Sequence, residues 1–92
     1  MREQRFQLLV RGRVQGVGFR NYVAHHAVRL GCTGYVCNLT DESAVAIVAE
    51  GTDAALRQLL ALVQRGSPLA RVDGIDIEWS DATGEHTVFA RR

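Results

Sequence analysis

The chain has 92 residues, of which 47% are hydrophobic and 23% charged, a composition that predicts one globular domain over residues 1–92 and excludes two separate cores. Eleven arginines and no lysine stand against ten acidic residues, so the formal charge is +1 and the net basic field typical of nucleic-acid-binding proteins is absent. The sequence has no apolar run long enough for a membrane span, and its first residues, MREQRFQ, lack the apolar segment of a secretory signal, so we expect a cytoplasmic protein.

The first half of the chain predicts a strand, a glycine-rich loop and a helix. Over residues 5–11 the apolar Phe6, Leu8 and Val10 alternate with other side chains, which is typical of a strand with one buried face. The segment GRVQGVGFR follows, at residues 12–20. An apolar stripe then predicts a helix over residues 21–30 that ends at Gly31.

The second half predicts a hairpin, a second helix and further strands. Residues 34–39 and 44–50 read as two strands joined by a turn over residues 40–43. Residues 53–65 carry a leucine stripe, with Thr52 as the expected N-cap and Gly66 as the residue that ends the helix. Alternation predicts another strand over residues 72–79 and a short last one over residues 87–90.

The order β-α-β-β-α-β predicts an α+β fold of the ferredoxin-like type. Two right-handed β-α-β halves place four antiparallel strands in one sheet, with both helices on one face and the short C-terminal strand as an addition. This fold carries many unrelated functions, so it does not decide the activity.

The loop before the first helix has the composition of an anion-binding site. The first N–H groups of a helix have no partner within the helix, and the helix dipole adds partial positive charge there. Gly16 and Gly18 allow the main chain to turn its amides toward a ligand, and Arg20 provides a permanently charged donor for phosphate oxygens. These residues fit a phosphate cradle, and they also fit a glycine-rich turn with a solvated arginine.

The run VQGVGFR, with GYVCNL, VAEG and SPLARVDGIDIEW further along the chain, resembles the acylphosphatase family. The resemblance implies hydrolysis of acyl phosphates to a carboxylate and inorganic phosphate, without metal or cofactor. It implies that Arg20 binds the phosphoryl group and that Asn38 positions the attacking water. It also implies a phosphate cradle made by Gln15, Gly16, Val17, Gly18, Phe19 and Arg20. One departure is the turn after Asn38, TDESA, which is longer than the family's usual Asp-Gly turn and predicts a different hairpin, with a bulge as one solution.

The resemblance and the composition together give the expected partners. We expect a small-molecule acyl phosphate as substrate, inorganic phosphate as product and inhibitor, and a monomeric protein with no nucleic-acid or membrane partner. An RNA-recognition domain needs aromatic residues on its central strands, and the strand VAIVAE has none.

Cys32 and Cys37 lack the spacing of a metal site, so no metal is expected and reduced thiols are favoured over a disulfide. The alternative function is a non-catalytic accessory module that binds phosphate or carbamoyl phosphate.

Overall fold

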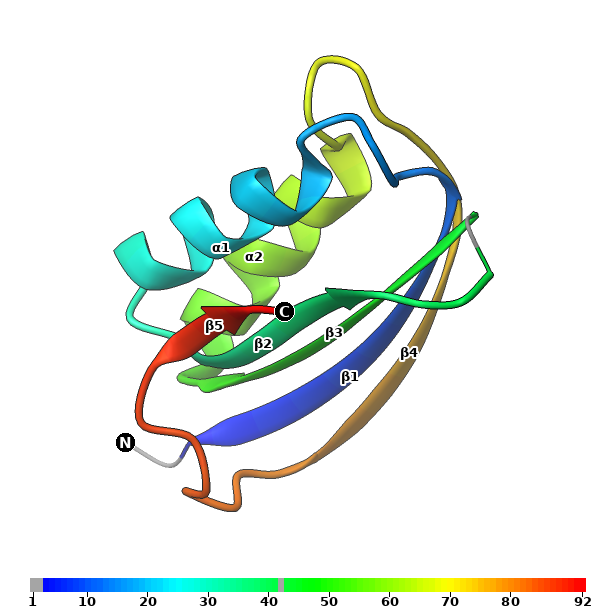
Figure 1. The fold of residues 1–92 in the computed structure, drawn as a ribbon. Helices are drawn as coiled ribbons and strands as arrows, with labels where there is room; N and C mark the ends of the chain where they lie inside the picture. Colours follow the sequence, from blue (N-terminus) through cyan, green and yellow to red (C-terminus); the bar gives the residue numbers. More distant parts are fainter. Residues whose placement is uncertain (1–2, 42) are drawn as a thin grey trace.

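The computed structural model describes residues 3–41 and 43–92, which form one five-stranded sheet covered on one face by two helices (Figure 1). The strands lie in the order β4-β1-β3-β2-β5. The elements are β1 (Gln4–Arg13), α1 (Phe19–Arg29), β2 (Thr33–Asn38), β3 (Ala44–Gly51), α2 (Asp53–Arg65), β4 (Arg71–Asp81) and β5 (Phe89–Arg91). The predicted ferredoxin-like α+β fold is confirmed. No helix in this part of the chain is long and apolar enough to cross a bilayer.

The core lies between the sheet and the helices. Phe6, Leu8 and Val10 of β1 are buried, as their alternation predicts. The two helices contribute the buried stripes Phe19, Val23 and Ala27, and Leu56, Leu59 and Val63. Thr52 caps α2 as expected, because its side chain accepts a hydrogen bond from the Ala55 N–H.

Most element boundaries differ by one or two residues from the sequence-based prediction. Helix α1 begins at Phe19 rather than at residue 21, because Gly18 takes a left-handed conformation and serves as the N-cap. The last strand is β5, which pairs in parallel with β2, so the sheet is mixed rather than purely antiparallel. The Gly34 N–H donates to Val88 O and the Arg92 N–H donates to Val36 O, which fixes the C-terminal segment beside β2.

The connection between β2 and β3 is hydrogen-bonded to β1. The Gly12 N–H donates to Ser43 O at 2.9 Å, beside a register shift between Arg11 and Gly12 in the pairing of β1 with β4. This shift lies at the point where β1 leaves the sheet and enters the glycine loop, whereas β2 and β3 pair in one register from Thr33 to Asn38. Position 42 of the predicted turn lies outside the described residues.

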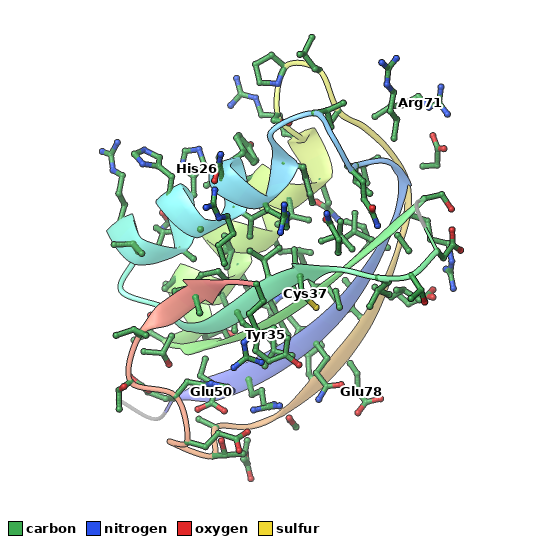
Figure 2. The ribbon with its side chains drawn as sticks, viewed as in Figure 1. His26, Tyr35, Cys37, Glu50, Arg71 and Glu78 are labelled. Atoms are coloured by element: carbon green, nitrogen blue, oxygen red, sulfur yellow. The ribbon has the colours of Figure 1, made fainter. Side chains whose placement is uncertain are left out.

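Glu50, at the opposite end of β3, is a buried carboxylate that fixes the connection from β4 to β5. Its side chain is 1% exposed and accepts hydrogen bonds from Arg5, from the Thr83 N–H and hydroxyl, and from the Gly84 N–H. Figure 2 shows Glu50 at that end of the sheet. Burial alone would raise the pKa of Glu50, but the hydrogen bonds from Thr83, Gly84 and Arg5 outweigh it and lower the pKa from 4.5 to about 2.

We expect Glu50→Gln to remove a pH-dependent part of the stability. Because the folded-state pKa lies below the unfolded value, the contribution of Glu50 is complete above about pH 4.5 and is lost as the pH falls toward about 2. Between pH 7 and pH 3 the wild-type protein should lose about 2 kcal/mol of unfolding free energy through Glu50 alone, and the variant should lack this loss. Urea unfolding at the two pH values measures the difference.

Glu85→Gln is the matched control for Glu50→Gln. Glu85 also contacts Arg5, at 2.8 Å, but its side chain is 58% exposed, so its replacement should change the unfolding free energy by less than about 1 kcal/mol. An equal pH response in the Glu85 variant would show that Arg5, rather than the buried carboxylate, controls the acid sensitivity.

Candidate active site

The loop between β1 and α1 is anchored at both ends by buried apolar side chains. Val14 and Phe19 are each 1% exposed, while Gly16 and Gly18 are exposed to solvent. Both glycines have left-handed φ angles, 72° at Gly16 and 77° at Gly18, a conformation that side chains disfavour. The chain therefore turns twice within three residues, between two fixed points in the core.

The N-terminus of α1 leaves several amides without a helical acceptor. The first helical hydrogen bond runs from the Tyr22 N–H to Gly18 O at 3.1 Å, so the N–H groups of Phe19, Arg20 and Asn21 precede the helical ladder. Gly18 provides no side-chain cap, and the first turn of the helix carries no acidic residue. The positive end of the helix dipole is therefore uncompensated by any side chain of this turn and favours an anion.

A cavity of about 160 Å³ lies at this helix end. It joins the glycine loop, the first turn of α1, the end of β2 and the end of β5, and its lining is Val14, Gly16, Gly18, Arg20, Asn21, Asn38 and Arg91. The Arg20 Nη1 donates to the main-chain oxygen of Arg92 at 2.7 Å, which fixes one arm of the guanidinium. Arg20 and Asn38, far apart in the sequence, therefore border one space.

Asn38 brings an unpaired acceptor to this cavity. It is the last residue of β2, and strand alternation places it on the same face as the core residue Val36. Tyr35 and Cys37 belong to the opposite face of the strand (Figure 2). Its Oδ1 is buried and has no hydrogen-bond partner within residues 3–41 and 43–92. A buried acceptor without a donor costs about 1–3 kcal/mol, so this oxygen is suited to a donor on a ligand or on water.

The predicted cradle residues divide into two groups. Gly16, Gly18 and Arg20 line the cavity together with Asn38. The side chain of Phe19 belongs to the hydrophobic core, and that of Val17 packs against the core, so only their main-chain groups are available to a ligand. The sequence-based reasoning missed Asn21 and Arg91 in the lining.

Gln15 was predicted to serve the cradle through its main-chain amide, and its side chain makes separate contacts. Its Nε2 donates to three carbonyl oxygens of the β2–β3 connection, those of Leu39, Asp41 and Ala44, at 2.8–3.1 Å. The side chain therefore ties the glycine loop to the hairpin that begins at Asn38. On the other side of the loop the buried Ser67 hydroxyl lies 3.5 Å from Val17 O, a contact that its position after α2 did not suggest.

We expect Gln15→Met to loosen the hairpin, because the side chain keeps its length but loses its donors. The unfolding free energy should fall by about 1–2 kcal/mol, and amide exchange of residues 39–44 should accelerate. Gln7→Met is the control, since Gln7 is an exposed residue of β1, and it should change neither quantity. If both variants behave alike, the three carbonyl contacts do not stabilise the hairpin.

The family model described as Acylphosphatase matches residues 6–91 of this chain. The chain belongs to the acylphosphatase family. Proteins of this name hydrolyse acyl phosphates, and the acylphosphatase of Methylococcus capsulatus (strain Bath) is 49% identical over 87 residues, which cover 95% of this chain and 94% of that protein.

Solved structures show the acylphosphatase fold in two settings. The crystal structure of acylphosphatase from Bacillus subtilis matches with a TM-score of 0.88 and 37% identity over 94% of each chain. Full-length HypF, in its phosphate- and nucleotide-bound form, matches with a TM-score of 0.88 and 26% identity over 98% of this chain but only 12% of that one. The acylphosphatase fold therefore occurs both as nearly the whole of a short chain and as a small part of a large one.

Metal-ligating side chains are scattered rather than clustered in this acylphosphatase. Within the part of the chain that the structure describes, no group of three or more His, Cys, Asp and Glu side chains is close enough to hold a metal ion. Cys32 is buried, Cys37 is half-buried, and both are free thiols. Burial raises the pKa of Cys32 to about 11, so this thiol stays protonated at neutral pH and is a poor nucleophile.

Proposed function

We propose that the cavity at the N-terminus of α1 is where this chain cleaves the carboxyl–phosphate anhydride of an acyl phosphate. The observation that carries this proposal is the meeting of two unlike groups in one small space. Arg20 and the loop amides offer donors to an anion, while the buried Oδ1 of Asn38 offers an acceptor that has no protein partner among the described residues. A phosphate dianion and a water molecule together satisfy both.

The phosphoryl group is held by main-chain amides and by Arg20. The amides of residues 15–20 lie on the loop and on the first turn of α1, where the helix dipole adds to their attraction for an anion. Arg20 keeps N–H donors beyond the one that contacts Arg92 O, so its fork can serve phosphate oxygens as well. This arrangement stabilises the equatorial oxygens as their charge redistributes in the transition state.

Asn38 orients the attacking water. Its Oδ1 accepts a hydrogen bond from the water, which directs a lone pair of the water oxygen toward phosphorus. Because the amide is neutral, it does not repel the phosphoryl dianion as a carboxylate would. The new bond joins the water oxygen to phosphorus, and the bond from phosphorus to the acyl oxygen breaks with its electron pair leaving on the carboxylate.

No protein base is needed for this step. The lining of the cavity contains no carboxylate and no histidine, so we assign the water proton to a phosphoryl oxygen of the substrate. The leaving group is a carboxylate, which accepts the electron pair without protonation at neutral pH. The lining also lacks His, Cys, Asp and Glu side chains, so it offers none of these common metal ligands.

Turnover of benzoyl phosphate in the presence of EDTA tests this function. We expect release of benzoate and inorganic phosphate, with competitive inhibition by inorganic phosphate. Loss of turnover on chelation would contradict the metal-free reaction. Binding of inorganic phosphate without any turnover would instead support the second candidate, a non-catalytic phosphate- or carbamoyl-phosphate-binding module, which the similarity to a small part of HypF favours.

The composition and the thiols bear on the cellular location and the partners of the protein. We propose that residues 1–92 act as a single monomeric domain in the cytoplasm. The two free thiols fit a reducing compartment. The formal charge of +1 and the absence of aromatic residues from β3 fit a protein without a nucleic-acid partner.

A further inference from the structure

A second arginine, Arg91, lies on the cavity beside Arg20. Residues two apart on a strand share a face, so Arg91 lies on the same side of β5 as the buried Phe89. The side chain of Arg92 lies on the other side of the strand, with its guanidinium 4.1 Å from the centre of the Tyr35 ring. Strand alternation therefore sends one of these two neighbouring arginines to the cavity and the other to the opposite face.

The guanidinium of Arg91 is held in place by Asn21. Its Nη1 donates to the Asn21 Oδ1, and both residues line the cavity. Asn21 directly follows Arg20 on α1, and successive residues on a helix point about 100° apart. Arg20 contacts Arg92 O, whereas Arg91 contacts Asn21, so the two guanidinium groups are held by separate acceptors.

The cavity has a second cationic side chain besides Arg20. Its lining contains two arginines and no acidic residue. In the proposed reaction the loop amides and Arg20 already serve the phosphoryl oxygens. Arg91 thus remains as a held cation at the same cavity, with N–H donors beyond the one that contacts Asn21.

We propose that Arg91 binds a second anionic group, on the acyl part of the substrate. The preferred substrates are then acyl phosphates of acids that carry another carboxylate or phosphate, rather than those with neutral acyl groups. This inference rests on the proposed function, because it concerns which acyl phosphate the same cavity accepts. Asn21 acts as the positioning residue for Arg91.

The test compares substrates that differ in one charge at one position. Benzoyl phosphate has no second anionic group. The 3- and 4-carboxybenzoyl phosphates add a carboxylate at two distances from the phosphate. In the 3- and 4-carbamoylbenzoyl phosphates a neutral amide of nearly equal shape replaces that carboxylate. We measure kcat/KM for each with the wild-type protein and with Arg91→Gln. The intrinsic reactivity of each substrate cancels when the two proteins are compared.

We expect at least one carboxyl substrate to exceed its carbamoyl counterpart in the wild-type protein. Arg91→Gln should lower kcat/KM for that substrate by about tenfold, as the loss of one charge-assisted hydrogen bond implies. For benzoyl phosphate and the carbamoyl substrates the loss should stay within about threefold, since these make no ion pair with Arg91. Arg91→Lys should retain part of the preference, and higher ionic strength should reduce it in the wild-type protein.

Arg29→Gln is the matched control. It removes one exposed arginine from the last turn of α1, at the opposite end of the helix from the cavity, and should leave the ratio of carboxyl to carbamoyl rates unchanged. If Arg91→Gln leaves that ratio unchanged, Arg91 only ties β5 to α1. If the variant instead loses turnover of every substrate and inhibition by inorganic phosphate to the same extent, Arg91 serves the phosphoryl group. Either result overturns the inference alone, whereas a wild-type protein that hydrolyses none of these substrates overturns the proposed function together with it.

Discussion

Replacing Arg20 with glutamine should lower kcat/KM for benzoyl phosphate by about 10³- to 10⁵-fold, the range measured for arginines that stabilise a transferring phosphoryl group. The side chain lines the cavity and belongs to the first turn of α1. Glutamine keeps a donor but loses the charge and the planar fork, so the transition state loses more than the bound substrate does. Inhibition by inorganic phosphate should weaken as well, because the product is also a dianion.

Two comparisons isolate the role of Arg20 in binding and turnover. Arg20→Lys restores the charge without the fork, and it should remain at least about tenfold below the wild-type protein. Arg13→Gln removes an exposed arginine from the end of β1, outside the cavity lining, and should retain wild-type kcat. Full activity in Arg20→Gln would remove Arg20 from the phosphate site.

The contact from Arg20 to Arg92 O adds a structural effect that must be measured separately. It joins α1 to the residue that follows β5. Arg20→Gln should therefore also lower the unfolding free energy by about 1 kcal/mol. Urea unfolding of the same variant gives that number. If kcat/KM falls by far more than the unfolded fraction of the variant can explain, the loss reflects the role of Arg20 in the site.

The sequence alone predicts the framework of this site because the framework follows from local periodicity. Alternation in Phe6, Leu8 and Val10 places β1, and the glycine loop after it marks the passage to a helix. Thr52 and Gly66 mark the ends of α2 by ordinary capping preferences. These signals lie within a few residues of the feature they predict.

The rest of the site depends on contacts between distant segments. The three residues of β5 are too few to show a period. Their parallel pairing with β2 is fixed by hydrogen bonds from the Gly34 N–H to Val88 O and from the Arg92 N–H to Val36 O. Arg91 reaches Asn21 only because of that pairing. The sequence also gives no sign of the contacts of the Gln15 side chain, because the carbonyl groups that it binds lie at least 24 positions away.

Asn38 is the position where function and stability should separate most clearly. Asn38→Ala removes the proposed water-positioning group and should lower kcat for benzoyl phosphate by about 10²- to 10³-fold. The amides of the loop and Arg20 remain, so inhibition by inorganic phosphate should change by less than about threefold. Steady-state kinetics with phosphate as inhibitor measures both quantities in one experiment.

The stability of the Asn38 variants provides the second readout. The wild-type Oδ1 is buried without a protein partner among the described residues, so Asn38→Ala removes an unsatisfied acceptor, and its unfolding free energy should not fall by more than about 1 kcal/mol. Asn38→Asp keeps the shape but adds a negative charge beside the phosphoryl site, and it should weaken phosphate binding as well as turnover. Equal losses of turnover and phosphate inhibition in Asn38→Ala, together with a large drop in stability, would mean that the amide holds the loop in place and does not orient water. If Asn38 binds the attacking water, its side chain should be required for turnover but not for the stability of the fold.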